Sequence, residues 1–180
     1  SDGVEYAFVR LGLRGYGSGK LVLDEYFDQN MRGAKEAGIK TGVYFFTQAI
    51  TVEEAIEEAD YVLENITGYD VSYPVVFDVE MIVNDDGRAN GLSQKDRTDI
   101  TIAFCDRIKA AGFTPMIYGN VKCFTKLLDM TRLNDYEKWY AFYDDYMYMP
   151  YEVGIWQYTE KGKVAGINTG VDLNISYKEY

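Results

Sequence analysis

The chain has 180 residues, 47% of them hydrophobic, and at this size one compact domain with its own core is expected, so we take residues 1–180 as a single domain. Its 18 basic and 29 acidic residues give a net charge of −11, which repels a phosphate backbone and argues against nucleic acid as a partner. Histidine is absent, which excludes Ser-His-Asp and Cys-His catalysis and most zinc sites. Carboxylates, lysine and tyrosine remain for acid–base chemistry, and we expect no metal and no cofactor.

Two further exclusions follow from the pattern of apolar residues and cysteines. No run reaches the roughly 18 apolar residues that a membrane-spanning helix needs, so no span is expected. Cys105 and Cys123 are too few for a disulfide scaffold and match no zinc motif. They are read as two buried thiols, and a single bridge between them stays open.

The first part of the chain alternates apolar runs with amphipathic stretches. Residues 4–11 (VEYAFVRL) predict a buried strand, and residues 12–19 form a glycine-rich loop without a nucleotide-binding fingerprint. Residues 24–37 predict a helix that ends at Gly38. Residues 41–47 (TGVYFFT) predict a second strand.

The middle of the chain holds the strongest helix signals. Thr51 and Glu54 form a capping box at the start of an amphipathic helix. Residues 73–80 (YPVVFDVE) predict a strand that ends in two acids, and Ser93 can cap a long helix ended by Gly112.

The last part of the chain is poorer in helical pattern. Residues 114–118 predict a strand, and Asn120 can cap a short helix over residues 121–130. Strand-like runs follow at residues 138–143, 153–158 and 170–175. Strands that alternate with helices indicate βαβ units and a parallel sheet, and we favour an α/β barrel over an open doubly wound sheet.

Asp78 and Glu80 are the first candidates for chemistry. They end an apolar strand and are separated by one residue, so both side chains point to one face, with Cα atoms roughly 6.5 to 7 Å apart. Two close carboxyls raise each other's pKa, which can leave one protonated and one ionised, as glycoside hydrolysis requires. The alternative is that they cap the strand and bind solvent or a cation.

Flat rings are expected beside these acids, because active sites of parallel α/β folds lie where strands end. The chain has 17 Tyr, nine Phe and two Trp, and such rings stack well on sugars, although core packing is the alternative for each of them. Asp172 and Asn174 are again spaced by two and can point into the same site. The rings at strand ends are Tyr44, Phe46, Tyr118, Trp139, Tyr143 and Trp156.

An ordered set of motifs, which covers nearly the whole chain, resembles the glycoside hydrolase family 25 lysozymes. The motifs are TGVYFF (41–46), YPVVFDVE (73–80), PMIYGN (115–120), WYAFY (139–143), IWQYT (155–159) and GVDLN (170–174). The resemblance implies an irregular TIM-like (β/α) barrel with fewer helices than strands. It also implies a muramidase that cleaves the β-1,4 bond between N-acetylmuramic acid and N-acetylglucosamine in peptidoglycan, outside the cell or in its wall.

The resemblance carries roles to individual residues. Glu80 resembles the general acid, and Asp78 resembles the neighbouring carboxylate that orients the N-acetyl group and stabilises the transition state. Asp172 matches a late active-site aspartate, and Gln157 and Asn174 are expected to bind substrate with the rings. The implied reaction retains configuration, with the acetamido oxygen of the substrate as the nucleophile.

Two departures from the family pattern are visible. Family members open with a strand that carries Asp-Val-Ser, and this sequence begins at what looks like the second strand; Phe45 stands where the family often has histidine. We therefore expect an open, horseshoe-like sheet, with unpaired edges at residues 4–11 and 170–175 that can pair with another chain. The rival functions are a wall-binding pseudoenzyme and a chitinase-like glycosidase.

Overall fold

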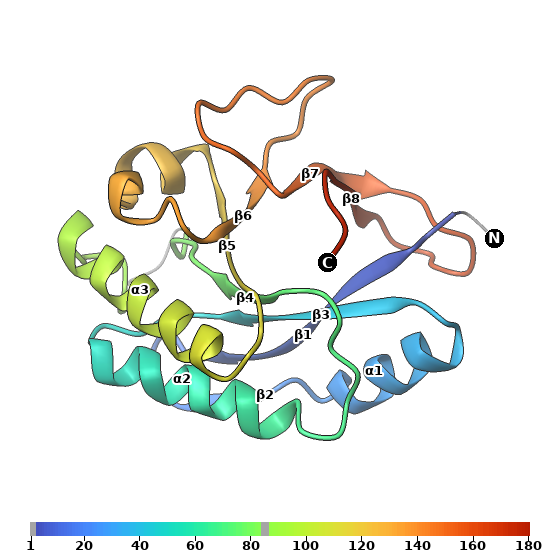
Figure 1. The fold of residues 1–180 in the computed structure, drawn as a ribbon, viewed down its shortest axis with the longest axis horizontal. Coiled ribbons are helices and arrows are strands. Elements are labelled where there is room, and N and C mark those ends of the chain that lie inside the picture. The colour runs from blue at the N-terminus through green and yellow to red at the C-terminus, as the bar shows by residue number, and fades with distance from the viewer. Residues whose placement is uncertain (1–2, 84–86) are drawn as a thin grey trace.

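The computed structural model describes residues 3–83 and 87–180 and shows one eight-stranded, curled sheet covered by helices on its outer face (Figure 1). The strand order is β2-β1-β3-β4-β5-β6-β7-β8. Strands β1 and β3 to β7 are parallel, and β2 and β8 are antiparallel to their neighbours. The strands are β1 Tyr6–Arg14, β2 Leu21–Leu23, β3 Lys40–Phe46, β4 Val75–Asp78, β5 Pro115–Asn120, β6 Glu137–Ala141, β7 Ile155–Gly162 and β8 Val171–Ser176.

Within those described residues three α-helices accompany the sheet: α1 Phe27–Glu36, α2 Val52–Asn65 and α3 Gln94–Ala110. Two of them begin where the sequence predicts, because the hydroxyl of Thr51 accepts from Glu54 N (3.2 Å) and that of Ser93 accepts from Asp96 N (3.1 Å). Helix α1 begins later than expected. Asp24 forms a local turn instead, since its carboxylate accepts a hydrogen bond from the backbone N–H of Tyr26.

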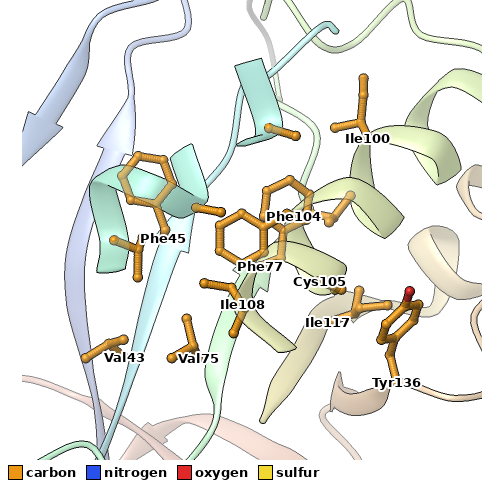
Figure 2. Packing of buried hydrophobic residues seen from close by; sticks show 14 of the residues in the cluster. Val43, Phe45, Val75, Phe77, Ile100, Phe104, Cys105, Ile108, Ile117 and Tyr136 are labelled. Carbon is orange, nitrogen blue, oxygen red and sulfur yellow. The ribbon is translucent and has the colours of Figure 1, made fainter. Parts of the chain in front are cut away.

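The two faces of the sheet carry different cores. The outer face packs against the helices, and Figure 2 shows this contact, with Phe77 stacked on Phe104 of α3 at 4.3 Å between ring centroids. The inner face carries a smaller cluster around Val76, Met116, Trp139 and Ile155. Alternation along β4 explains the division, because Val75 and Phe77 point outward and Val76 and Asp78 point inward.

The sheet is a curled half-barrel that ends at β2 and β8, as expected for an open, horseshoe-like sheet, and the described strands do not close into a TIM-like barrel. Strand β2 is outermost in the strand order, but it pairs only with Gly12–Arg14. Among the described strands, residues 6–10 of β1 therefore pair with β3 alone, and this part of residues 4–11 forms an unpaired edge as predicted. Strand β1 continues through Gly12–Arg14, which we expected in a loop, and turns back so that these residues pair with β2. Gly12 permits the close approach, because a Cβ there would lie 2.2 Å from the carbonyl oxygen of Val22. Self-association through the sheet edges stays a prediction.

The expected short helix at residues 121–130 is also different in the structure. Asn120 caps it as predicted, by accepting from Cys123 N at 3.2 Å, but the segment forms a π-helix, Cys123–Leu127, and a 3₁₀ turn, Met130–Arg132. Leu128 is extended and breaks the helix. The 3₁₀ turn then begins at Asp129, whose side chain accepts from Thr131 N.

Cys105 and Cys123 are free and buried, as the thiol reading predicts. Among the helices that the structure describes, none is long and apolar enough to cross a membrane.

Candidate active site

The three carboxylates predicted for the site line one cavity of about 1230 Å³ inside the curl of the sheet: Asp78, Glu80 and Asp172. Asp78 ends β4, Glu80 follows two residues later, and Asp172 lies near the start of β8. Because β8 is antiparallel, its start lies at the same end of the sheet as the carboxyl end of β4. The expected convergence is therefore observed.

Burial and mutual repulsion perturb this cluster. The side chain of Asp78 points to the inner face, the residue is only 6% exposed, and burial followed by the charge of Glu80 raises its pKa well above the usual value. Burial and the charge of Asp172 raise the pKa of Glu80, and the neighbouring hydroxyl of Tyr118 opposes this shift. Burial and Glu160 raise the pKa of Asp172. Each of these carboxyls therefore binds a proton more readily than an ordinary exposed carboxyl does.

One oxygen of Asp78 stands out among these groups. Among the residues that the structure describes, Asp78 Oδ1 has no hydrogen-bond partner although it is buried. A buried carboxylate oxygen without a donor is costly, at about 1–3 kcal/mol. It is an acceptor positioned at the cavity and able to receive an N–H or O–H from a bound molecule.

Aromatic side chains form one wall of the cavity. Trp139 on β6 lies with its ring centroid 4.7 Å from that of Tyr118 and 6.4 Å from that of Tyr44. The indole N–H of Trp139 donates to Asn174 Oδ1 at 2.8 Å, which fixes the ring in the plane it presents to the cavity. All four residues line the cavity, so the sequence prediction places them correctly relative to the acids.

Gln157 joins two tyrosine hydroxyls beside the acids. Gln157 on β7 lines it, and its Oε1 accepts from the hydroxyls of Tyr118 (2.8 Å) and Tyr143 (2.9 Å). Tyr143 follows β6, is half exposed and does not itself line the cavity. Its hydroxyl nevertheless contacts the cavity-lining side chain of Gln157.

Two predicted ring residues are not brought into the cavity. Trp156 alternates with Gln157 along β7 and therefore points to the other face, where its indole N–H donates to the carbonyl oxygen of Phe142 at 2.7 Å. Phe46 lies beside Asp78 in the strand register and is half-buried, but it does not line the cavity.

Other rings that line the cavity were missed. Tyr6 and Phe8 point inward from β1, and Tyr6 stacks on Tyr73 at 4.7 Å. The alternation of Tyr6, Phe8 and Arg10 in the first apolar run was the signal that could have placed them on one face. Tyr158 also lines the cavity, because the register of β7 against β8 shifts at this residue. No pattern in the sequence predicts this shift.

No candidate metal centre accompanies these groups. In residues 3–83 and 87–180, no set of three or more Cys, Asp or Glu side chains is arranged to hold a metal ion. The arrangement of the three carboxyls supports proton donation by one and stabilisation of positive charge by another.

Comparison with known proteins identifies the family. The sequence model of glycosyl hydrolases family 25 matches residues 1–167. The chain belongs to this family. A similar protein, YegX of Escherichia coli (strain K12), is 28% identical over 178 residues, which cover 96% of this chain and 59% of YegX.

Solved structures agree with this assignment. The modular autolysin LytC from Streptococcus pneumoniae matches with a TM-score of 0.82 and 27% identity, over 96% of this chain and 41% of LytC. LytC has also been solved in complex with a synthetic peptidoglycan ligand. The spore cortex lytic enzyme SleM from Clostridium perfringens matches with a TM-score of 0.80 and 23% identity, over 96% of this chain and 60% of SleM, and shares the fold. This chain thus spans 59% of YegX and 41% of LytC.

Proposed function

We propose that this family 25 chain is the catalytic part of a muramidase, which cleaves the β-1,4 bond between N-acetylmuramic acid and N-acetylglucosamine in peptidoglycan. The observation that carries the proposal is the convergence of Asp78, Glu80 and Asp172 on one cavity walled by aromatic rings. Membership of family 25 and the likeness to a peptidoglycan-binding autolysin support the substrate class. Such a substrate lies in the cell wall, so we also propose that the protein acts there or outside the cell.

Glu80 acts as the general acid. Burial keeps its carboxyl protonated at a higher pH than usual, so it can donate this proton to the glycosidic oxygen as the bond to the sugar carbon breaks. The electron pair of the broken bond goes to the leaving oxygen, which becomes a hydroxyl. Glu80 is left as a carboxylate and recovers a proton from the water that completes hydrolysis.

Asp78 orients the acetamido group of the muramic acid residue. Its unpartnered Oδ1 accepts the acetamido N–H, and this hydrogen bond favours the ionised form of Asp78. In the empty cavity Asp78 has a strongly raised pKa, so substrate binding moves the shared proton toward Glu80. The acetamido oxygen then attacks the sugar carbon, water opens the resulting ring, and configuration is retained.

The remaining predicted residues hold the glycan. Tyr44, Tyr118 and Trp139 offer ring faces to the apolar faces of pyranose rings, and Asn174 keeps the Trp139 ring in place. Asp172 adds negative charge next to the sugar carbon that becomes positive in the transition state.

The test is digestion of purified peptidoglycan, followed by borohydride reduction and mass spectrometry of the soluble fragments. New reducing ends on muramic acid are expected, and reducing ends on glucosamine would contradict the assignment. Binding to the insoluble polymer without release of fragments would identify a wall-binding pseudoenzyme instead. Preferential digestion of chitin would identify a chitinase-like glycosidase.

A further inference from the structure

The hydroxyl of Tyr118 donates to Gln157 and belongs to a residue that lines the same cavity as Glu80. Tyr118 pairs with Asp78 in the register of β5 against β4, and its carbonyl oxygen accepts from Val79 N at 3.1 Å, so the residue runs beside the strand end that leads to Glu80. Its ring is held by Trp139, at 4.7 Å between centroids. The position of the hydroxyl is therefore fixed by backbone pairing and by ring packing.

The first acceptor is Gln157. This side chain is 2% exposed, and its Oε1 receives both the Tyr118 hydroxyl at 2.8 Å and the Tyr143 hydroxyl at 2.9 Å. An amide oxygen has two lone pairs, so these two donors fill it. Gln157 consequently takes the only proton that the Tyr118 hydroxyl can donate.

The second acceptor is Glu80, which lines the same cavity as Tyr118 and follows directly after Val79, whose backbone N–H donates to the Tyr118 carbonyl oxygen. The Tyr118 hydroxyl lowers the pKa of Glu80, against the effect of burial. A phenol carries one proton and cannot donate it fully to both acceptors. A hydrogen bond to a carboxylate is roughly twice as strong as one to a neutral amide, so the ionised state of Glu80 competes with Gln157 for this proton.

We propose that Tyr118 is a positioning residue whose hydroxyl turns from Gln157 to Glu80 as the acid gives up its proton. The inference rests on the proposed role of Glu80 as the general acid. Before the reaction the hydroxyl donates to Gln157 Oε1. When the proton of Glu80 moves to the glycosidic oxygen, Tyr118 keeps its own proton and donates it to the new carboxylate. The hydrogen bond from Tyr118 to Gln157 is thus broken when Glu80 ionises, and it forms again when Glu80 recovers a proton.

The competition predicts opposite effects for two substitutions. Tyr118→Phe removes the donor but keeps the ring against Trp139, so the Glu80 carboxylate loses a partner and Glu80 titrates at higher pH. Gln157→Leu removes the competing acceptor, so Tyr118 donates to Glu80 alone and Glu80 titrates at lower pH. Tyr143→Phe is the matched comparison, since it removes the other hydroxyl on Gln157 and leaves the Tyr118 hydroxyl in place.

The first measurement is the titration of the Glu80 carboxyl by ¹³C NMR in the wild type and the three variants, which needs no turnover. Relative to wild type, we expect the titration midpoint of Glu80 to lie at higher pH in Tyr118→Phe and at lower pH in Gln157→Leu. In Tyr143→Phe the midpoint should be unchanged. Circular dichroism checks folding, and Gln157→Met replaces the Leu variant if Leu prevents it. Shifts of Tyr118→Phe and Gln157→Leu in the same direction, or no shift in either, would overturn the proposal.

The second measurement is the pH dependence of fragment release from soluble glycan. Tyr118→Phe should lower kcat by about 10-fold or more, the effect of one hydrogen bond to a charged group, and leave KM unchanged. A rise in KM with unchanged kcat would show that Tyr118 only binds substrate and would also overturn the proposal. Absence of fragments even from the wild type would refute the proposed function instead, and the titration would still decide the role of Tyr118.

Discussion

The buried ion pair between Arg14 and Glu58 predicts a large loss of stability when only one partner is removed. Arg14 ends β1 with a side chain 4% exposed, and its Nε donates to Glu58 Oε1 at 2.7 Å, where the Glu58 side chain is 0% exposed. Arg14 also donates to the carbonyl oxygens of Gly19 and Glu54. Arg14→Met keeps most of the volume but leaves a carboxyl without its cation.

The expected cost follows from that geometry. Removing one partner of a buried pair destabilises a protein by about 3–5 kcal/mol. For a chain of this length that corresponds to a melting temperature about 6–20 °C lower. Glu58→Gln in the same background removes the uncompensated charge, so the double variant should be more stable than Arg14→Met alone.

The assay is urea unfolding followed by far-UV circular dichroism at several pH values. Burial raises the pKa of Glu58 to about 7 even with Arg14 and Thr47 beside it, and loss of Arg14 raises this pKa further. A carboxyl with a raised folded pKa makes the folded state less stable as pH rises, so the difference from wild type should widen above pH 7.

The control is Arg32→Met, which breaks an exposed pair with Asp28 in α1 and should leave the urea midpoint unchanged. If Arg14→Met were as stable as Arg32→Met, or if its loss did not depend on pH, the account of this ion pair would be refuted.

Two further predictions concern the site and the strand next to it. Asp78→Asn should become more stable relative to wild type as pH rises from 4 to 7, measured by urea unfolding. Burial and the charge of Glu80 raise the pKa of Asp78, so ionisation of Asp78 destabilises the folded wild type, and Asn does not ionise. A stability difference that is constant with pH would contradict this. Gly119→Ala should destabilise by about 1–3 kcal/mol, because its Cβ would lie 2.6 Å from the sulfur of Cys123. Gly33→Ala, in α1 with open space around it, should stabilise by about 0.5–1 kcal/mol, and equal effects of the two Ala variants in thermal melts would refute the packing argument.

The sequence predicts the parallel core of the fold well, because apolar strands and capped helices leave local signals. Thr51 and Ser93 cap helices as expected, and the run that includes Val75 and Phe77 forms a buried strand. The hairpin of β1 and β2 was missed, because β2 is three residues long and its pairing depends on the close approach at Gly12. The break at Leu128 was missed as well, since it depends on tertiary contacts.

Part of the candidate site was predicted because side chains alternate between the two faces of a strand. Spacing by two along a strand places Asp78 with Glu80 and Asp172 with Asn174, and both pairs line the cavity. The same rule applied to β7 excludes Trp156 once Gln157 is known to point inward. Sequence alone does not say which of two alternating residues points inward when both faces of the strand are apolar.

The central claim is that Glu80 supplies the proton for glycosidic cleavage, and substitution by glutamine tests it most directly. Glu80→Gln keeps the shape of the side chain but has no proton to give, so it should retain the urea midpoint and lose at least ~100-fold in the rate at which reducing ends appear from purified peptidoglycan. The control is Glu53→Gln on the first turn of α2, outside the cavity, which should cleave at the wild-type rate. A Glu80→Gln variant that folds normally and cleaves at the wild-type rate would contradict the account.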